Sequence, residues 1–204
     1  IRYFINKNDL LGKVYEAIES NINNDFSLDY PYYDENDKEN FDLANEIITD
    51  FNAKIGLERL ITTSIPMTYT EGNYIMYLRK NTQKKEYQVD YFPLGVVEIS
   101  EYNINGDPYI LVNINELKTR LNKNYKKGKN NKSLFYENLE DEVKNTMPKE
   151  VYKAFKKNDK YAKLDINNSG VMRVNNFNKL YGLSPVFKSL KPVIRLENVE
   201  LSDD

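Results

Sequence analysis

The densest group of residues able to do chemistry is a run of cations near the middle of the chain. Between Glu116 and Glu137 lie seven lysine and arginine residues and no acidic residue. Clustered lysines on an exposed segment can contact phosphate groups. The candidate phosphate contacts are Lys123, Lys126, Lys127, Lys129 and Lys132. Gly128 and nearby asparagines are typical of a flexible segment, and specific phosphate sites more often use arginine. The sequence therefore favours a flexible basic loop over residues 118–135, with phosphate contact as the less favoured interpretation.

A second candidate is the segment Asp165-Ile166-Asn167-Asn168-Ser169-Gly170. Spaced oxygen ligands followed by glycine resemble the start of an EF-hand calcium loop, because glycine permits the sharp turn around the ion. The twelfth position of such a loop should supply a bidentate glutamate, and here it is Asn176. The preceding residues 156–160 include three lysines, which disfavour a cation. We therefore predict a turn and no calcium site.

Tyrosines and consecutive carboxylates are the remaining candidates for functional residues. Aromatic side chains can stack on nucleic-acid bases, and the chain offers two tyrosine groups: Tyr30, Tyr32, Tyr33 and Tyr69, Tyr74, Tyr77. Loop and strand tyrosines more often pack half-buried with the hydroxyl reaching water, and we expect packing here. The consecutive residues 140–142 and 203–204 are all acidic. Neighbouring side chains do not face each other on a helix, so we interpret them as solvated charge.

Two missing residue types narrow the possible functions. The chain has no histidine, which is the residue most used for acid–base catalysis near neutral pH, and no cysteine, which excludes disulfides and thiolate metal sites. It also lacks a phosphate-binding glycine loop, a nucleophile elbow and zinc-ligand spacing. We predict a protein that is not an enzyme and uses no cofactor or metal.

Charge and hydropathy indicate no preference for nucleic acid or membrane. The formal net charge is −2 over 204 residues, so the overall field attracts neither DNA nor anionic lipid strongly. No apolar run approaches the length that crosses a bilayer. We expect no membrane association.

Apolar periodicity predicts helices in the first third of the chain. Apolar residues recur at helical spacing over residues 9–22 and again from Phe41 to Ile55. Gly56 fits the C-cap of the second helix, and residues 57–65 indicate a short third helix.

The period changes to two after residue 72, which predicts strands. Residues 74–79 and 87–91 alternate and are joined by a short polar segment, as in a hairpin. Residues 96–102 and 109–114 form a second pair around Asn105-Gly106. Asn-Gly is a strong hairpin signal because both residues tolerate positive φ.

Helical patterns return in the last part of the chain. Residues 115–121 and 149–157 have helical character, and residues 171–174 form a strand that fits the sheet. Ser184-Pro185 looks like an N-cap with proline at the first helical position. Pro192 falls inside that last helix and should kink it or start a second one.

The order of these elements predicts one α+β domain over residues 1–204. N-terminal helices precede a central antiparallel sheet of about four strands, and C-terminal helices follow. Because the sequence does not begin with Met, we interpret it as a piece of a longer gene product.

Several segments, in this order, resemble portal proteins of tailed bacteriophages that infect low-GC Gram-positive hosts. The similarity extends over most of the chain, and the order of the segments carries it more than any one motif. The segments are residues 10–16, 51–57, Thr70-Glu71-Gly72-Asn73-Tyr74, 147–151, 163–165 and Leu180-Tyr181-Gly182-Leu183-Ser184-Pro185-Val186.

The resemblance implies a structural role in a virus particle. Portal proteins form a ring, typically of twelve subunits, at one capsid vertex, and DNA passes through its centre. They are virion components assembled in the cytoplasm of the bacterial host. The implied partners are other copies of the chain, the terminase large subunit, capsid and head-completion proteins, and double-stranded DNA contacted without sequence preference. ATP hydrolysis belongs to the terminase. This chain would cover much of the outer wing of such a subunit.

A different class of protein remains as the alternative. The basic segment 118–132 would suit an accessory protein that binds nucleic acid without catalysis. For assembly, we expect the complete gene product to form a ring and this chain alone to be a monomer or weak oligomer. That expectation assumes that the apolar residues are consumed by one internal core.

Overall fold

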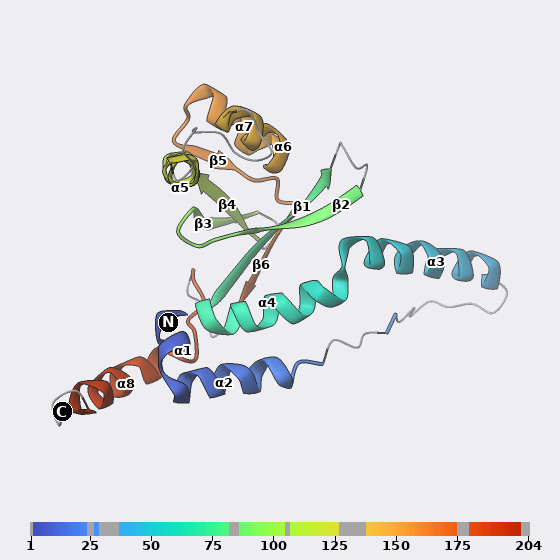
Figure 1. Cartoon of the computed structure of the whole chain (residues 1–204). Helices are drawn as coiled ribbons and strands as arrows, with labels where there is room; N and C mark the ends of the chain where they lie inside the picture. Colours follow the sequence, from blue (N-terminus) through green and yellow to red (C-terminus); the bar gives the residue numbers. More distant parts are fainter. Residues whose placement is uncertain are drawn as a thin grey trace.

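The computed structural model describes residues 2–23, 27–28, 37–81, 86–104, 107–126, 138–174 and 180–200. It confirms the α+β class: eight helices are combined with two small antiparallel sheets of three strands each in the described residues. Figure 1 shows the sheets, with the helices that cover them, stacked above a layer formed by the other helices.

The N-terminal helices form the lower layer in Figure 1. The chain runs through α1 (Arg2–Lys7), α2 (Asp9–Ser20), α3 (Lys38–Ile55) and α4 (Leu57–Glu71). Asn8 caps α2, because its side-chain oxygen accepts a hydrogen bond from Leu11 N at 3.2 Å. Gly56 separates α3 from α4 in the left-handed region at φ 64°, as predicted for a C-cap. The predicted third helix continues through Pro66 to residue 71.

The strands form two sheets. One has the order β2-β1-β6 and contains β1 (Asn73–Asn81), β2 (Glu86–Phe92) and β6 (Ser169–Arg173). The other has the order β3-β4-β5 and contains β3 (Val97–Ile104), β4 (Asp107–Asn113) and β5 (Tyr161–Lys163). Both predicted hairpins, β1–β2 and β3–β4, are confirmed by antiparallel pairing. The Asn105-Gly106 connection lies outside the described residues.

The prediction of one sheet of about four strands is corrected. After β2, Pro93 has no N–H to continue a ladder, and Val96 N donates to Pro93 O at 2.9 Å to close a turn. The chain then begins a new sheet. The open edge of β1 pairs with β6, as expected for a strand at 171–174, and the open edge of β4 pairs with β5.

Four helices lie in the second half of the described chain. They are α5 (Ile114–Lys126), α6 (Leu139–Thr146), α7 (Lys149–Lys157) and α8 (Phe187–Glu200). The prediction of a flexible loop over 118–135 is wrong for residues 118–126, which continue α5, and residues 127–137 lie outside the described residues. Pro192 is accommodated within α8, which is assigned as one helix.

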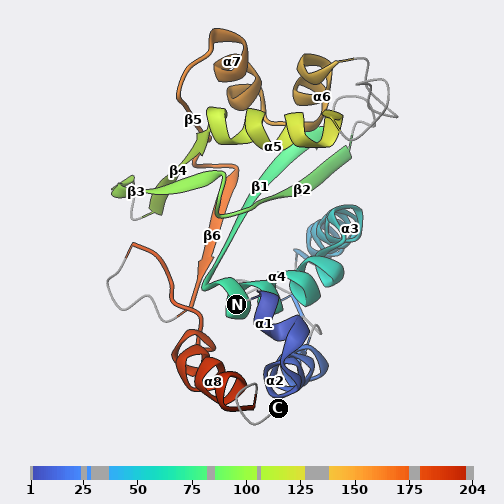
Figure 2. The same ribbon diagram turned by 60° about the vertical axis from the view of Figure 1, so that its left-hand side comes forward.

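The hydrophobic core belongs to one part of the molecule, which we call the sheet half: β1–β6 with α5–α7, in residues 73–174. Every buried side chain of the main core cluster lies between Ile75 and Leu164. Figure 2 shows α5, α6 and α7 covering the strands from one side. The largest fully buried aliphatic side chains are Ile75, Ile110, Ile114, Leu164, Val112, Val143 and Val151.

The remaining helices, α1–α4 in residues 2–71 and α8, form what we call the helical half. Its only buried hydrophobic side chains among the described residues are Leu11 and Val193, apart from Pro66. The 18 residues of α3 include none that is buried. None of the helices within the described ranges is long and apolar enough to cross a membrane.

Candidate functional site

The first part of the basic segment, residues 118–126, is helical and not a flexible loop. In α5, Lys118 donates to Asn158 Oδ1 and its ammonium lies 4.7 Å from the centre of the Phe155 ring. Arg120 Nε donates to Glu116 Oε1 at 2.8 Å, and the guanidinium lies directly against Gly95, where an added Cβ would be 2.0 Å from Nη2. Lys118 therefore joins α5 to α7, whereas Arg120 pairs within α5 and contacts the chain at Gly95.

Among the five lysines predicted to contact phosphate, only Lys123 has a side chain that the structure describes. Lys123 lies exposed on α5. Lys126 is the last residue of that helix, but its side chain is outside the description, as are residues Lys127, Lys129 and Lys132. Phosphate contact by this group stays a prediction.

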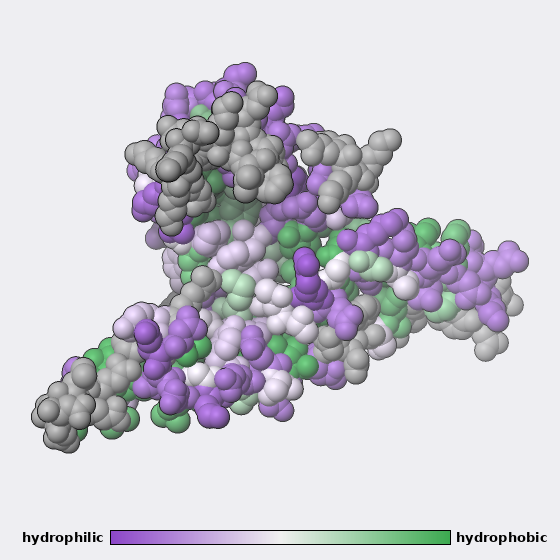
Figure 3. Space-filling model, viewed as in Figure 1, coloured by the Kyte–Doolittle hydropathy of each residue, from purple (hydrophilic) through white to green (hydrophobic). Residues whose placement is uncertain are grey.

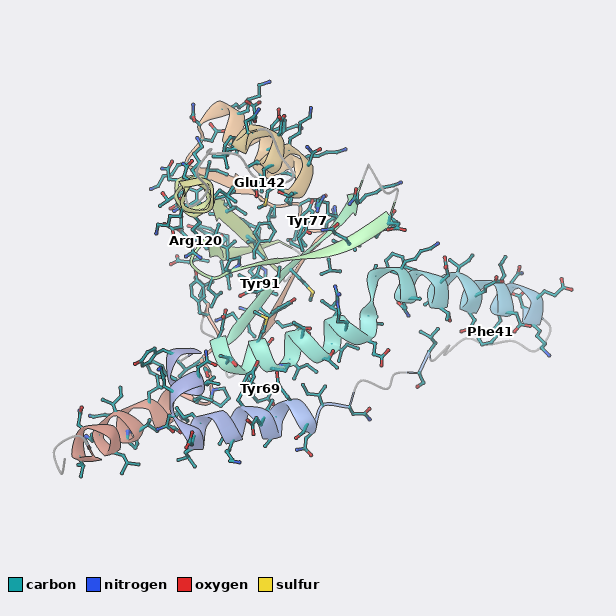
Figure 4. The ribbon with its side chains drawn as sticks, viewed as in Figure 1. Phe41, Tyr69, Tyr77, Tyr91, Arg120 and Glu142 are labelled. Atoms are coloured by element: carbon teal, nitrogen blue, oxygen red, sulfur yellow. The ribbon has the colours of Figure 1, made fainter. Side chains whose placement is uncertain are left out.

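A cavity of about 400 Å³ opens between the β1–β2 hairpin and the α6–α7 connection. Tyr77 lies at this cavity, between β1 and α7 (Figure 4), and its hydroxyl donates to Glu150 Oε2 at 3.3 Å. Burial raises the pKa of Tyr77 to about 12, and the negative charge of Glu150 adds to the shift. The phenol is therefore protonated at neutral pH.

Arg79, which lines the same cavity, forms a largely buried ion pair with Asp90. Arg79 Nε and Nη2 donate to the two carboxylate oxygens of Asp90 at 2.6 and 3.3 Å, and Nη1 donates to Asn145 O at 3.1 Å. Both side chains of the pair are largely buried, at 13% and 15% exposure. The Arg79 guanidinium thus joins the β1–β2 hairpin to α6. The exposed residues Lys80, Lys144 and Lys149 also line the cavity.

The segment around Asp165 is a turn, as predicted. Asp165 Oδ1 accepts from Asn167 N at 3.0 Å, and Oδ2 accepts from Asn168 Nδ2 at 2.9 Å. Both carboxylate oxygens therefore serve the turn that leads into β6. Within the described part of the chain, no three or more His, Cys, Asp or Glu residues come together as a group able to hold a metal ion.

The prediction that the tyrosines pack is confirmed for Tyr74 and Tyr77, which are more deeply buried than expected, but not for Tyr69. Tyr74 and Tyr77 are buried, and Tyr74 stacks on Tyr91 with ring centres 4.9 Å apart. Tyr69 is 40% exposed on α4, and residues 30–33 and 203–204 lie outside the described residues. The interpretation of residues 140–142 as solvated charge is wrong for Glu142, because its Oε2 is buried without a hydrogen-bond partner.

Two of the segments that carry the resemblance, residues 70–74 and 180–186, meet in space at Gly72 and Gly182, which the sequence did not predict. A Cβ added at Gly182 would lie 2.1 Å from Gly72 O, and one added at Gly72 would lie 2.4 Å from Gly182 O. Gly72 also has φ 81°, which favours glycine. The backbones of residues 72 and 182 therefore approach each other more closely than any side chain would permit.

Side chains fasten this crossing, which we call the junction. Asn73 Nδ2 donates to Gly182 O at 3.1 Å, and Asn73 Oδ1 accepts from Gly182 N at 2.7 Å. Ser184 Oγ donates to Tyr69 O at 2.7 Å. The buried polar groups of Asn73 and Ser184 are thus satisfied, and α4 and β1 are tied to the chain entering α8.

The outer surfaces of α3 and α8 are the most unusual feature of the helical half. Leu43 and Ile47 on α3 are 55% and 59% exposed, whereas the other residues of the predicted apolar stripe are half-buried: Phe41, Ala44, Ile48, Phe51 and Ile55. On α8, Phe187, Leu196 and Val199 are each more than half exposed. Figure 3 shows green apolar surface on both projecting ends among purple polar atoms. The expectation that the apolar residues are consumed by an internal core is wrong.

No family model, no curated protein and no solved structure matches this chain.

Proposed function

We propose that this chain is a non-catalytic structural subunit of a bacteriophage portal ring. In this role it forms part of the wing around the channel through which double-stranded DNA is packaged and ejected. The ring lies at a capsid vertex of the virion, after assembly in the cytoplasm of the bacterial host. Its partners are other copies of the chain, the terminase large subunit that docks on the ring, and capsid and head-completion proteins.

The observation that carries the proposal is the unequal burial of the two halves. The sheet half has a closed apolar core, whereas α2, α3 and α8 leave large aliphatic side chains in contact with water. Patches of this kind, bordered by polar residues, are typical of protein–protein interfaces. A rigid sheet half with apolar helices extending from it suits a subunit that is completed by its neighbours.

The junction supports the resemblance to portal proteins. Two of the six segments that carry the resemblance, residues 70–74 and 180–186, form one hydrogen-bonded crossing although more than 100 residues separate them. The close approach of the two backbones explains why Gly72, Gly182 and Asn73 occur at these positions. The resemblance therefore involves residues that build the fold as well as residues on its surface.

The contacts of Lys118 and Arg120 with side chains of their own chain also agree with this role. A ring through which DNA moves needs weak contacts that do not depend on base sequence, because a tight hold on phosphates would oppose translocation. The formal net charge of −2 fits that requirement.

The test is electron microscopy and mass measurement of the purified complete gene product. We expect closed rings of uniform subunit number that bind the purified terminase large subunit. A protein that stays monomeric at concentrations of tens of micromolar contradicts the proposal. Strong, salt-dependent DNA binding by the monomer, lost when Lys123 and Lys126 are changed to Gln, would instead favour the nucleic-acid-binding alternative.

A further inference from the structure

The exposed surface of α3 combines apolar and acidic side chains on one side of the helix. An α-helix turns by about 100° per residue, so six exposed residues between 39 and 50 fall within roughly 140° of its circumference. They are Glu39, Asp42, Leu43, Glu46, Ile47 and Asp50. This set is called the acidic face. Asp50 pairs with the exposed Lys54, which falls within the same arc one turn further along, so the net acidic charge of the face comes from Glu39, Asp42 and Glu46.

The exposed surface of α8 has the opposite charge and a similar apolar content. The same spacing places six exposed apolar or basic side chains within roughly 140° of its circumference. They are Phe187, Lys188, Lys191, Ile194, Arg195 and Val199. This set is called the basic face. The opposite side of α8 packs inward, because Val193 is buried and Leu190 is half-buried.

The two faces cannot cover each other within one molecule as it is folded here. Helix α3 extends from one side of the molecule and α8 from the other (Figure 1). The C-terminal part of α3 is anchored to the sheet half, since the Phe51 ring packs edge-to-face on Tyr87 with centres 5.6 Å apart. Its outer part, with Phe41 labelled in Figure 4, projects away from the rest of the chain.

We infer that the acidic face of α3 binds the basic face of α8 on a second copy of this chain. Each face offers aliphatic or aromatic side chains beside charges of one sign, so apolar burial and charge pairing favour the same partner. Like-signed faces repel, which disfavours an α3–α3 or α8–α8 contact. Because the faces lie at opposite ends of one chain, the contact is head-to-tail and repeats from copy to copy.

This inference deepens the proposed function and rests on it in one respect, namely that copies of the chain assemble. It adds which surfaces meet and in which direction. The occupant is a second copy because the complementary face is present on the chain itself. Binding to an unrelated partner, or to a further segment of the same polypeptide, would not explain why the two faces of this chain are complementary to each other.

Site-directed cross-linking of the complete gene product tests the contact. The 204 residues contain no cysteine, so within them each introduced thiol is unique. Variants Ile47→Cys and Ile194→Cys are prepared separately, mixed and oxidised. We expect a disulfide-linked dimer in the mixture and little or none in either variant alone. Asn45→Cys lies exposed on α3 outside the acidic face, and its mixture with Ile194→Cys should not cross-link.

Charge exchange gives a second measurement on the same protein. Glu46→Lys and Arg195→Glu should each weaken self-association by about tenfold or more, and the double variant should recover most of the loss. Glu101→Lys changes an exposed charge on β3 and should leave association within about twofold of the unchanged protein.

Each outcome separates this contact from the broader proposal. Rings that form without a cross-link between the thiols introduced at positions 47 and 194 overturn the contact while the portal role stands. A cross-link between two Ile47→Cys chains shows a symmetric contact and also overturns it. An intramolecular disulfide between the same two positions, in a chain carrying both substitutions, would assign the face to the same polypeptide. Cross-linking that needs an added capsid protein would assign it to that partner. A protein that never associates overturns both proposals.

Discussion

The sheet half and the helical half both contain regular apolar stripes, but the stripes are buried to different extents. In the sheet half, the stripes of β1, β4, α5 and α7 converge on one buried cluster. In the helical half, the aliphatic stripe of α3 leaves Leu43 and Ile47 exposed, and no residue of the helix is buried. Every large exposed aliphatic side chain among the described residues lies in residues 2–71 and 184–200. This difference is the one that the proposed assembly requires, with a closed core in one half and exposed apolar side chains in the other.

The polar residues differ between the halves in the same way. The Arg79–Asp90 pair of the sheet half is largely buried and bidentate, whereas the Lys54–Asp50 pair of α3 is more than half exposed. A buried pair fixes geometry and is costly to break, while an exposed pair on a helix contributes only about 0.3–0.5 kcal/mol. The charges on α3 therefore matter little for the stability of the isolated chain and remain available to a partner.

The largest expected effect is the truncation of a core side chain. Ile110→Ala shortens a side chain that is 0% exposed, and the cavity left behind should lower the free energy of unfolding by about 3–4 kcal/mol. The matched change Ile47→Ala on α3 should alter it by less than about 0.5 kcal/mol. Urea unfolding followed by circular dichroism, on dilute protein, measures both. Similar losses of unfolding free energy for Ile110→Ala and Ile47→Ala would show that the two halves do not differ in burial.

The second effect tests the junction, where the halves are joined. The methyl group of Gly182→Ala would meet Gly72 O at 2.1 Å and Val174 O at 2.7 Å, and these backbone atoms cannot move without breaking the crossing. We expect a loss of about 2–3 kcal/mol. Asn73→Ala, which removes both side-chain bonds to residue 182 without a clash, should cost about 1–3 kcal/mol. Thermal melts of both variants measure these losses, and unchanged melting temperatures would show that the crossing is not formed.

The third effect is confined to the sheet half and to alkaline pH. Tyr77 has a pKa of about 12 in the folded chain, against a usual value near 10.0, so between these values the folded state retains a proton that the unfolded state has lost. Stability therefore falls as pH rises from 10 towards 12, by about 2 kcal/mol from this group. Tyr77→Phe should make that fall shallower. Unfolding free energies at pH 8 and pH 11.5 measure the difference, and equal falls in both proteins would contradict the assignment.

Local signals explain what could be predicted from the sequence. The helices at 9–20, 38–55 and 149–157 follow from apolar spacing and caps, and both hairpins follow from period-two patterns. These elements are determined by residues within a few positions of one another. Helix α6 escaped prediction because its apolar content is low and its first turn is acidic, although the cap Asn138 was a usable signal.

Long-range contacts explain what could not be predicted. The division into two sheets depends on which late strand pairs with each open edge, and the junction depends on residues 73 and 182 meeting across the fold. A sequence pattern also looks alike whether its apolar stripe faces a core or a partner. For that reason the exposure of Leu43, Ile47 and the basic face of α8 became visible only in the structure.

The smallest effect concerns a glycine in the helical half, matched to Gly182. Gly56 has φ 64°, but an added Cβ would meet nothing within 4 Å. Gly56→Ala should therefore cost only the backbone strain, about 1 kcal/mol. Asn tolerates the left-handed region, so Gly56→Asn should cost less, whereas Gly182→Asn should be no better than Gly182→Ala because its penalty is steric. Urea titrations of the four variants measure this order. A Gly56→Ala loss as large as that of Gly182→Ala would mean that the α3–α4 connection is packed as tightly as the junction, which would contradict the open space around Gly56.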